Sequence, residues 1–235
     1  MKKTSSRTPH RKVNVAVVGL GFMGVTHIKV YQKLKTARIV AVCDSARAPV
    51  NGVLPGVAGN ITGSDAIDLG RQLRVYRTLE ELLADPEVEL VDLCVPTALH
   101  PQQAIAALKA GKHVLCEKPL ALTSAKARSM VRAARAARGF FMPAMCMRFW
   151  PGWAFLKQVV TEETYGKIQA ASFRRLSATP GWSKATYSSG SLTGGALLDL
   201  HIHDTDFVQF LFGRPDSVAS RGVTRGGDSI DHVVT

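Results

Sequence analysis

The segment Val13-Asn14-Val15-Ala16-Val17-Val18-Gly19-Leu20-Gly21-Phe22-Met23-Gly24 decides the fold of this chain. Its β-branched run predicts a buried strand, and the three glycines have the spacing G-x-G-x-x-G before a helical pattern. Gly19 permits the tight turn, Gly21 lets backbone amides approach a pyrophosphate, and Gly24 lets the helix pack closely on the sheet. The helix N-terminus favours an anion, because its N–H groups are unpaired and its dipole end is positive. The segment therefore predicts a dinucleotide-binding turn.

A second strand supports this interpretation. Residues 38–43 follow the predicted helix at 23–35 and end at Asp44. The acid lies roughly 20 residues after the glycines, where such a site places an acceptor for the ribose hydroxyls. A carboxylate there favours NAD, because it repels the 2′-phosphate of NADP. Ser45 and Arg47 are near enough to accommodate NADP, so NAD is preferred and NADP stays open.

Strand and helix patterns alternate as far as residue 145. A nearly continuous apolar run at 88–95 is typical of a strand buried on both faces. Thr78 and Glu81 have capping-box spacing at the start of a short helix. The alternation predicts right-handed βαβ units and a parallel sheet, and hence an α/β domain over residues 13–145. The glycine- and proline-rich segment 46–68 is expected to be an insertion near the adenosine end of a cofactor.

The pattern changes after residue 145. The sequence predicts two helices, at 153–163 and 196–212, and three strands, at 168–176, 217–223 and 230–235. A polar, aromatic loop is expected at 180–193. This order predicts an α+β domain over residues 146–235, with a helix on one face of an open sheet. The last predicted strand runs to the final residue without a closing turn. We therefore expect the sheet to be incomplete and its edge to be open to association.

Composition and charge exclude several classes of protein. The net charge is +12, but residues 1–12 are a basic segment without an apolar core, which predicts a disordered tail rather than a secretory signal. The basic residues at 126–138 indicate a solvated helix face, so no nucleic-acid partner is expected. No apolar run approaches the ~18 residues of a membrane span. The four cysteines lack metal-type spacing, which predicts a reduced, cytoplasmic setting.

Two clusters supply side chains for chemistry. Glu117-Lys118-Pro119 follows the fifth predicted strand, and ligands of parallel sheets bind beyond the carboxyl ends of the strands. The second cluster begins at Gly194-Gly195. On a helix, Asp199 and His203 share one face, so the aspartate can orient the imidazole and favour its protonated form. This pair is an acid/base candidate that titrates near neutrality, and a core histidine satisfied by Asp199 is the alternative.

Three motifs, taken together, resemble the Gfo/Idh/MocA oxidoreductase family. They are the glycine turn, Cys116-Glu117-Lys118-Pro119-Leu120 and Gly194-Gly195-x-x-x-Asp199-x-x-x-His203-Asp204, and the resemblance extends from about Val13 to the end. The resemblance implies a Rossmann domain that binds NAD or NADP and a second domain with an open sheet beside the nicotinamide. It implies an NAD(P)-dependent dehydrogenase or reductase that acts on a CH–OH group of a sugar, cyclitol or related polyol. His203 would be the general acid/base, Asp199 would orient it and contact substrate, and Lys118 would polarise the reacting oxygen and relay the proton.

The resemblance also implies a cis bond before Pro119 and further sheet strands beyond residue 235, so the second domain is expected to be truncated. The expected cofactor contacts come from the glycine turn and from the ends of three later strands: Gly19, Gly21, Phe22, Met23, Gly24, Asp44, Ser45, Arg47, Pro96, Thr97, His100, Glu117 and Lys118. Thr97 and His100 could equally serve to cap the next helix. A sugar pocket could be lined by Arg148, Trp150 and Trp182, for which packing between domains is the alternative.

A metal is not expected at Asp199-x-His201-x-His203, because helical geometry splays side chains two residues apart. Three functions remain open. The first is the oxidoreductase, and the second is a glycoside-cleaving relative that keeps NAD bound and recycles it. The third is a non-catalytic nucleotide-binding protein. The expected partners are a small carbohydrate-like substrate and, if the second sheet is complete, another copy of the chain through that sheet.

Overall fold

The computed structural model describes residues 11–59, 65–178, 181, 189–224, 228 and 230–235. The chain divides into two compact units. The first contains residues up to 95 together with 99–116 and 129–142, and the second contains 96–98, 117–128 and 143–235. No helix of the described residues is long and apolar enough to cross a lipid bilayer.

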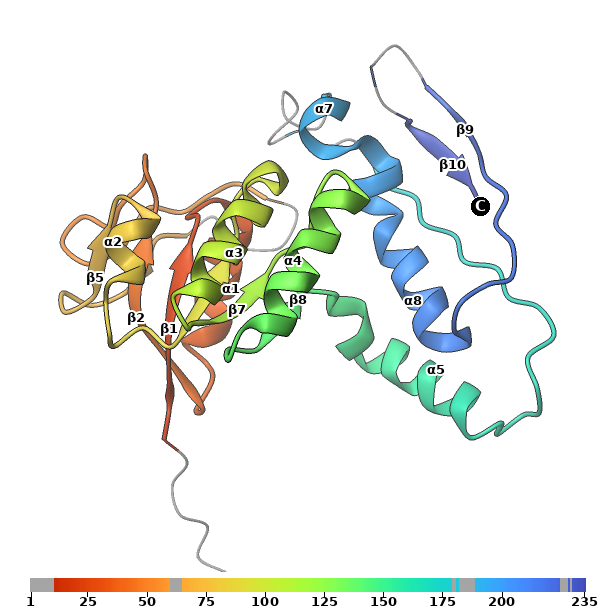
Figure 1. Cartoon of the computed structure of the whole chain (residues 1–235), viewed down its shortest axis with the longest axis horizontal. Helices are drawn as coiled ribbons and strands as arrows, with labels where there is room; N and C mark the ends of the chain where they lie inside the picture. Colours follow the sequence, from red (N-terminus) through yellow and green to blue (C-terminus); the bar gives the residue numbers. More distant parts are fainter. Residues whose placement is uncertain (1–10, 60–64, 179–180, 182–188, 225–227, 229) are drawn as a thin grey trace, which may run out of the picture. The chain divides into compact units, whose positions relative to one another are not determined.

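The described residues of the first unit carry a six-stranded sheet in the order β5-β2-β1-β6-β7-β8 (Figure 1). Its strands are β1 (Val13–Val18), β2 (Ala37–Cys43), β5 (Arg74–Tyr76), β6 (Leu90–Leu93), β7 (His113–Cys116) and β8 (Phe141–Pro143). The pairs β1–β2, β1–β6, β2–β5 and β6–β7 are all parallel. The predicted parallel α/β sheet is therefore confirmed. The strand order reverses between β1 and β6, which is where sheets of this type bind ligands.

Helices connect these strands as predicted. They are α1 (Phe22–Tyr31), α2 (Leu79–Leu83), the 3-10 turn η1 (Thr97–Leu99), α3 (His100–Lys109) and α4 (Ser124–Ala136). The predicted capping box at α2 is formed, because Thr78 and Glu81 each accept a hydrogen bond from the other's backbone N–H. β1 is central to the core: five of its six residues are buried, and Val15 and Val17 cluster with Val25 and Ile28 of α1.

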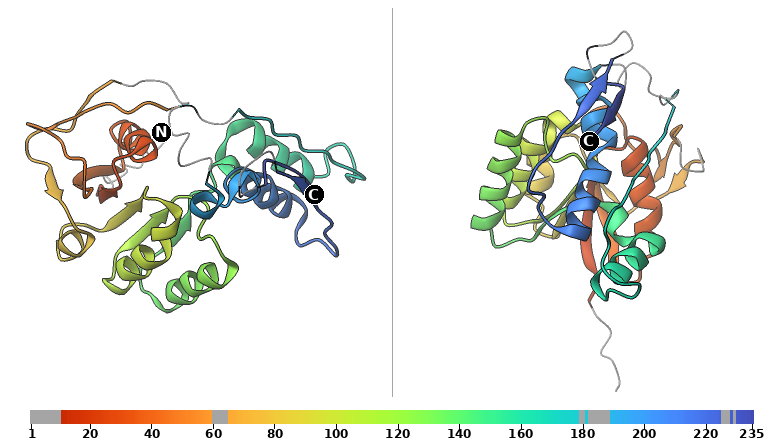
Figure 2. Two further views of the ribbon diagram at one scale, coloured as in Figure 1. Left: turned by 90° about the horizontal axis from the view of Figure 1, so that it is seen from above. Right: turned by 90° about the vertical axis from the view of Figure 1, so that its right-hand side faces the viewer.

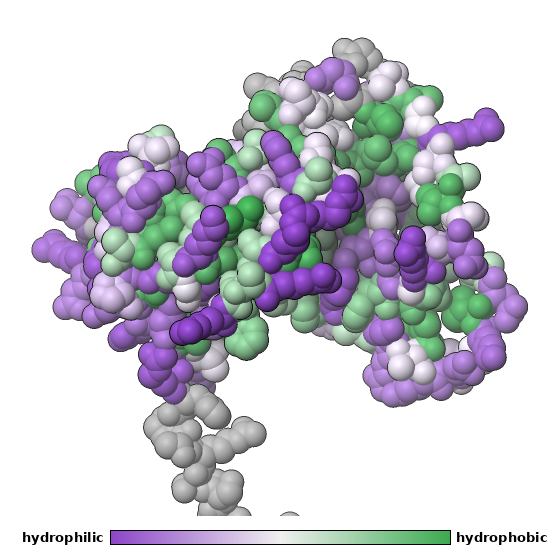
Figure 3. Space-filling model, in the orientation of Figure 1, coloured by the Kyte–Doolittle hydropathy of each residue, from purple (hydrophilic) through white to green (hydrophobic). Residues whose placement is uncertain are grey.

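The predicted insertion at 46–68 forms a small antiparallel hairpin of β3 (Val53–Leu54) and β4 (Ile67–Asp68), and residues 60–64 lie outside the described part. The arginines at 128, 132 and 135 on α4, and Arg138 just after it, are exposed. Figure 3 shows hydrophilic side chains gathered over this helix, as a solvated face requires.

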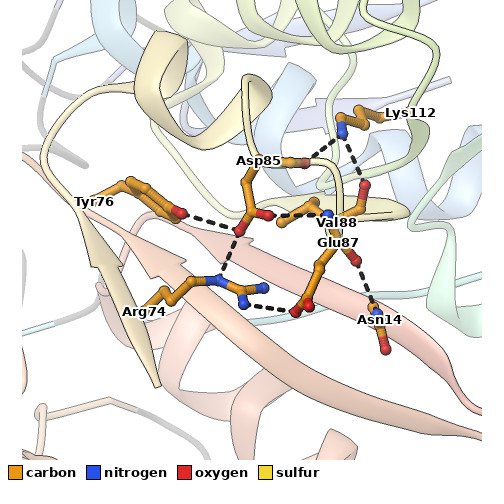
Figure 4. Close-up of polar contacts among 7 residues, drawn as sticks. All are labelled: Asn14, Arg74, Tyr76, Asp85, Glu87, Val88 and Lys112. Atoms are coloured by element: carbon orange, nitrogen blue, oxygen red, sulfur yellow. Dashed lines mark hydrogen bonds and ion pairs between the residues drawn. The ribbon is translucent and has the colours of Figure 1, made fainter. Parts of the chain in front are cut away.

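A polar network ties the loop before β6 to the sheet, at the end away from the glycine turn (Figure 4). Asp85 accepts from the Tyr76 hydroxyl at 2.9 Å, and its carboxylate lies 2.7 Å from Arg74 Nε. The buried Lys112 ammonium donates to the backbone oxygens of Asp85 and Val88, at 2.7 and 2.9 Å. Since these contacts satisfy buried polar groups of the loop itself, the network stabilises the sheet edge rather than forming a binding site.

The described residues of the second unit are mainly helical: η2 (Cys146–Phe149), α5 (Pro151–Thr161), α7 (Gly190–Thr193), a π-helical turn (Ala196–Leu200) and α8 (Ile202–Phe212). β9 (Arg221–Val223) and β10 (His232–Val234) form an antiparallel pair. Helices α5 and α8 lie side by side (Figures 1 and 2) around a core of Met147, Phe207 and Leu211. Trp153 packs edge-on against Phe207, with ring centroids 4.7 Å apart.

Two details of the second unit differ from prediction. The segment 168–176 forms no strand with any described residue, although its alternation is real: Phe173 and Arg175 are partly buried while Arg174 is exposed. The alternation arises because Phe173 packs on the Trp153–Phe207 cluster and Arg175 pairs with Asp204, so one side of an unpaired segment is buried. The predicted helix at 196–212 is also interrupted, by the π-helical turn and His201.

Candidate active site

Two of the three turn glycines are required by the protein's own backbone. Gly19 has φ of +88°, and a Cβ there would lie 2.6 Å from the backbone oxygen of Cys94. A Cβ on Gly24 would lie 1.8 Å from the backbone oxygen of Gly19. Gly21 is different, because a Cβ there would meet no atom of the described residues within 4 Å. The chain therefore leaves open space at Gly21, next to the first turn of α1 with its N–H groups outside the helical ladder.

Asp44 connects the end of β2 to this turn. Its carboxylate accepts from the backbone N–H groups of Leu20, Ala46 and Arg47, at 2.7, 2.9 and 2.8 Å. Partial burial acts to raise the pKa of this carboxyl, but the three N–H donors and the Arg47 charge outweigh it and lower the pKa below its usual value. Asp44 is therefore an anion held beside the glycine turn.

The segment after Asp44 also lies against the turn. The Arg47 guanidinium donates to the backbone oxygens of Leu20 and Pro55. A Cβ on Gly59 would lie 1.9 Å from the ring of Phe22, the first residue of α1. Ser45 is exposed. Of the predicted residues, Phe22 and Met23 lie in the first turn of α1, and Arg47 contacts the backbone just before it.

The residues after β6 are placed differently. Pro96 is exposed, and Thr97 begins η1. The His100 side chain is 1% exposed, and its Nε2 lies 2.8 Å from the backbone oxygen of Val95. This contact supports the alternative in which His100 fixes the strand-to-helix connection.

In the second unit, Lys118 and Asp199 come together across 81 residues of sequence. The Lys118 Nζ donates to both the backbone oxygen and Oδ1 of Asp199, each at 2.9 Å. Glu117 accepts from the Lys118 backbone N–H at 3.0 Å. The Lys118–Pro119 bond is cis, as predicted. The ion pair is partly buried, since the side chains of Lys118 and Asp199 are 19% and 26% exposed.

A π-helical turn aims Asp199 at this lysine. The His201 N–H donates to the Ala196 oxygen, five residues back, at 2.9 Å. The turn follows Gly194 and Gly195, whose φ values of +77° and +66° are open to glycine without strain. Asp199 is therefore not one regular α-helical turn before His203. Asp199 Oδ1 binds Lys118, and the charge of Asp199 still acts on the His203 ring, so the predicted pairing of Asp199 with the histidine stays a prediction.

His203 is held neutral. Burial, followed by the charges of Lys118 and Arg175, lowers its pKa to about 4, although the charges of Glu117 and Asp199 act in the opposite direction. Its Nδ1 is buried and has no hydrogen-bond partner among the described residues. The predicted protonated form that titrates near neutrality is therefore wrong: desolvation and two cations outweigh the carboxylates. A neutral imidazole beside an ammonium can accept a proton from a hydroxyl, while the ammonium donates to the same oxygen.

Sequence reasoning missed Arg175. Its guanidinium binds the Asp204 carboxylate through two nitrogens, with Nε 2.9 Å from Oδ2 and Nη2 2.8 Å from Oδ1. It lies in the segment 168–176, which was predicted to be a strand. The sequence signal that could have pointed to an ion pair was the presence of a charged side chain in that predicted strand. His201 also serves structure, because its Nε2 lies 3.0 Å from the Thr235 hydroxyl.

Of the predicted pocket residues, Arg148 binds the Asp206 carboxylate at 2.8 and 2.5 Å, and its guanidinium lies 4.7 Å from the ring centre of Phe210. Its guanidinium is thus engaged within the second unit. Trp150 is 49% exposed at the start of α5. Trp182 lies outside the described residues.

Two family models match this chain. The first, described as an oxidoreductase family with an NAD-binding Rossmann fold, matches residues 13–144, and the second, the GFO/IDH/MocA C-terminal domain, matches residues 153–235. An uncharacterized oxidoreductase of Synechocystis sp. is 30% identical over 216 residues, covering 91% of this chain and 55% of its own length. Levoglucosan dehydrogenase of Pseudarthrobacter phenanthrenivorans is 30% identical over 214 residues, covering 88% of this chain and 53% of its own length.

Among solved structures, an NAD binding oxidoreductase from Klebsiella pneumoniae superposes with a TM-score of 0.72 at 26% identity, over 94% of this chain and 62% of that one. This chain thus spans about half the length of the curated relatives it matches. The motif order, the parallel sheet and the matches to both domains agree. The chain belongs to the GFO/IDH/MocA oxidoreductase family, whose first domain is an NAD-binding Rossmann fold.

Proposed function

We propose that this protein is an NAD-dependent oxidoreductase that moves a hydride between the cofactor and a CH–OH or carbonyl group of a sugar, cyclitol or related polyol. The observation that carries the proposal is the Lys118–Asp199 ion pair together with a neutral His203 whose buried Nδ1 lacks a partner among the described residues. The proposal assigns cofactor binding to residues 13–145 and substrate chemistry to residues 146–235 with Lys118. The levoglucosan dehydrogenase supports a carbohydrate-like substrate.

The residues of the first unit fit a dinucleotide. The open space at Gly21 and the first-turn N–H groups of α1 suit a pyrophosphate, which approaches backbone closely and carries negative charge. The anionic Asp44 suits ribose hydroxyls and disfavours a 2′-phosphate, so NAD is the proposed cofactor. The cofactor supplies the hydride acceptor when it is bound.

Residues of the second unit are proposed to carry out the proton transfer. The neutral His203 accepts it from the substrate hydroxyl during oxidation, through the nitrogen that its tautomer leaves unprotonated. The Lys118 ammonium donates a hydrogen bond to the same oxygen and stabilises negative charge that develops there. Asp199 holds the ammonium in place through two 2.9 Å contacts. Asp199 therefore positions Lys118, where the resemblance had assigned it to His203.

The test is a ligand panel followed by turnover. NAD should stabilise the protein against heat more than NADP, because a specific ligand stabilises only the folded state. NADH formation should then appear with one or more members of a panel of sugars, anhydrosugars and cyclitols. If neither nucleotide binds, the proposal is wrong. Release of sugar from a glycoside without net NADH would indicate the cofactor-recycling alternative, and binding without turnover would indicate a non-catalytic protein.

A further inference from the structure

We propose that His27 is a positioning residue for the cofactor. Through a hydrogen bond to the buried Asp92, it fixes α1 against β6 at the place where the helix N-terminus would meet the pyrophosphate. This inference rests on the proposed function and adds to it a residue that contacts neither the cofactor nor the reacting atoms.

The contact itself is short and buried. His27 Nδ1 lies 2.8 Å from Asp92 Oδ2, across 65 residues of sequence. Asp92 lies on β6, in the middle of the sheet, and is 0% exposed, while the His27 side chain is 17% exposed. Because a buried carboxylate is costly without a donor, the imidazole of α1 satisfies a charge that β6 buries. Tyr31, one helical turn further on, faces the same carboxylate: burial raises the pKa of its hydroxyl, and the charge of Asp92 raises it further.

The His27–Asp92 pair is linked to the glycine turn through Cys94. A Cβ on Gly24 would lie 3.6 Å from the Cβ of Cys94, and a Cβ on Gly19 would lie 2.6 Å from the Cys94 oxygen. The Cys94 Sγ lies 3.4 Å from His27 Nδ1. Gly24 and His27 are three residues apart and so share one face of α1. A shift of α1 on β6 therefore moves the turn that would hold the pyrophosphate.

Helix α1 meets the Asp92 carboxylate of β6 with two polar side chains, His27 and Tyr31. Its N-cap residue is Gly21, which offers no side chain to hold the first turn, and the apolar contacts of Val25 and Ile28 are non-directional. The hydrogen bond from His27 is directional and specifies one register of the helix on the strand. Loss of one backbone hydrogen bond to a charged group such as a pyrophosphate lowers affinity by about 10- to 100-fold.

His27, Asp92 and Cys94 also have ligand atoms close enough together for a metal ion. The distances favour a hydrogen bond. Two ligands on a tetrahedral ion with bonds of ~2.0 Å lie about 3.3 Å apart. The 2.8 Å between Nδ1 and Oδ2 is shorter than that and is typical of an N–H···O bond. The cluster is therefore assigned a positioning role.

Two polar substitutions test this assignment in the full chain. His27→Asn carries an amide nitrogen near the position of Nδ1 and can still donate to Asp92, whereas the His27→Gln amide corresponds to Nε2 and cannot reach in the same way. We expect the Kd for NAD, measured by calorimetry, to rise about 10- to 100-fold in His27→Gln and to stay within about threefold of wild type in His27→Asn. KM for NAD should rise in the same order, while kcat with the polyol substrate changes less than about twofold.

His113→Gln is the matched control, because the Nδ1 of His113 accepts from the Phe140 N–H at 2.9 Å, elsewhere in the same sheet. It should lower Tm and leave the Kd for NAD unchanged. The proposal is overturned if both His27 variants bind NAD like wild type, or if Asn binds as weakly as Gln. It is also overturned if purified protein contains one zinc per chain that both variants lose. If wild type itself binds no NAD, the proposed function fails, whereas wild type that binds NAD with His27 variants that do not differ as stated overturns this inference alone.

Discussion

The two candidate regions of this molecule are built by opposite means. In the first unit, the region around the glycine turn is made of backbone: glycines with no room for a Cβ, an open position at Gly21 and the start of a helix. In the second unit, the region is made of side chains: Lys118 and His203 come from distant segments, and a π-helical turn aims Asp199 at Lys118. A site made of backbone can be predicted from the local spacing of residues in the sequence, whereas a site made of side chains depends on tertiary contacts. Substitutions should therefore damage the two regions in different ways.

The largest expected effect is at Lys118. Lys118→Ala removes the donor to the reacting oxygen, so kcat/KM should fall about 10²- to 10⁴-fold. The measurement is steady-state NADH formation with the best substrate of the panel. Lys157→Ala is the matched control, since the Lys157 ammonium donates to the backbone oxygen of Phe210 at 2.8 Å in the same unit. Equal activity of Lys118→Ala and wild type would remove this residue from the mechanism.

The next largest effects are expected from Gly21→Ala and Gly24→Ala, which should change NAD affinity and stability respectively. A methyl group at Gly21 enters open space, so Tm should not fall, while the Kd for NAD should rise about tenfold or more because the pyrophosphate loses close approach to the backbone. At Gly24 a methyl group collides with the Gly19 oxygen, and overpacking should cost about 1–3 kcal/mol of stability. Thermal melts with and without NAD separate the two effects. If Gly21→Ala binds NAD normally, the open space serves another purpose.

A smaller effect is expected at Asp44. Asp44→Asn removes the anion but keeps the shape of the side chain. Affinity for NAD should fall about tenfold, and the preference for NAD over NADP should narrow or reverse, because repulsion of the 2′-phosphate is lost. Titrations of both nucleotides against wild type and variant measure the change. Wild-type protein that already prefers NADP would contradict the assignment of NAD.

The smallest effect concerns pH. Because the pKa of His203 is lowered to about 4 in the folded state, the unfolded chain binds its proton first as pH falls below the ordinary value near 6.5. The contribution of His203 to stability is therefore complete above about pH 6.5 and is lost as pH falls towards 4. His203→Gln should flatten the dependence of Tm on pH in that window, whereas His232→Gln, at an exposed histidine, should leave it unchanged.

The sequence allowed the first region to be predicted in detail because its determinants are local. The glycine spacing and the capping box at Thr78 follow from short patterns, and both are present, whereas the cis bond at Pro119, which is also present, was implied by the family resemblance. The environment of His203 was not predictable in this way. Its lowered pKa comes first from burial and then from the charges of Lys118 and of Arg175, which lies 28 positions earlier in the chain. Helical spacing alone gave no sign of the contact between Lys118 and Asp199. The segment 168–176 was mistaken for a strand because burial on one side produces the same alternation as sheet pairing.

The π-helical turn at 196–200 sets the rotational phase of everything that follows it. One residue of helix corresponds to about 100° of rotation, so the inserted residue decides which side of α8 meets the arginines. In the present phase, Asp204 reaches Arg175 and Asp206 reaches Arg148. Deletion of a single residue from the turn would leave α8 helical yet rotate both carboxylates away from their cations. A local irregularity in one helix thus selects the charge pairing of the whole second unit.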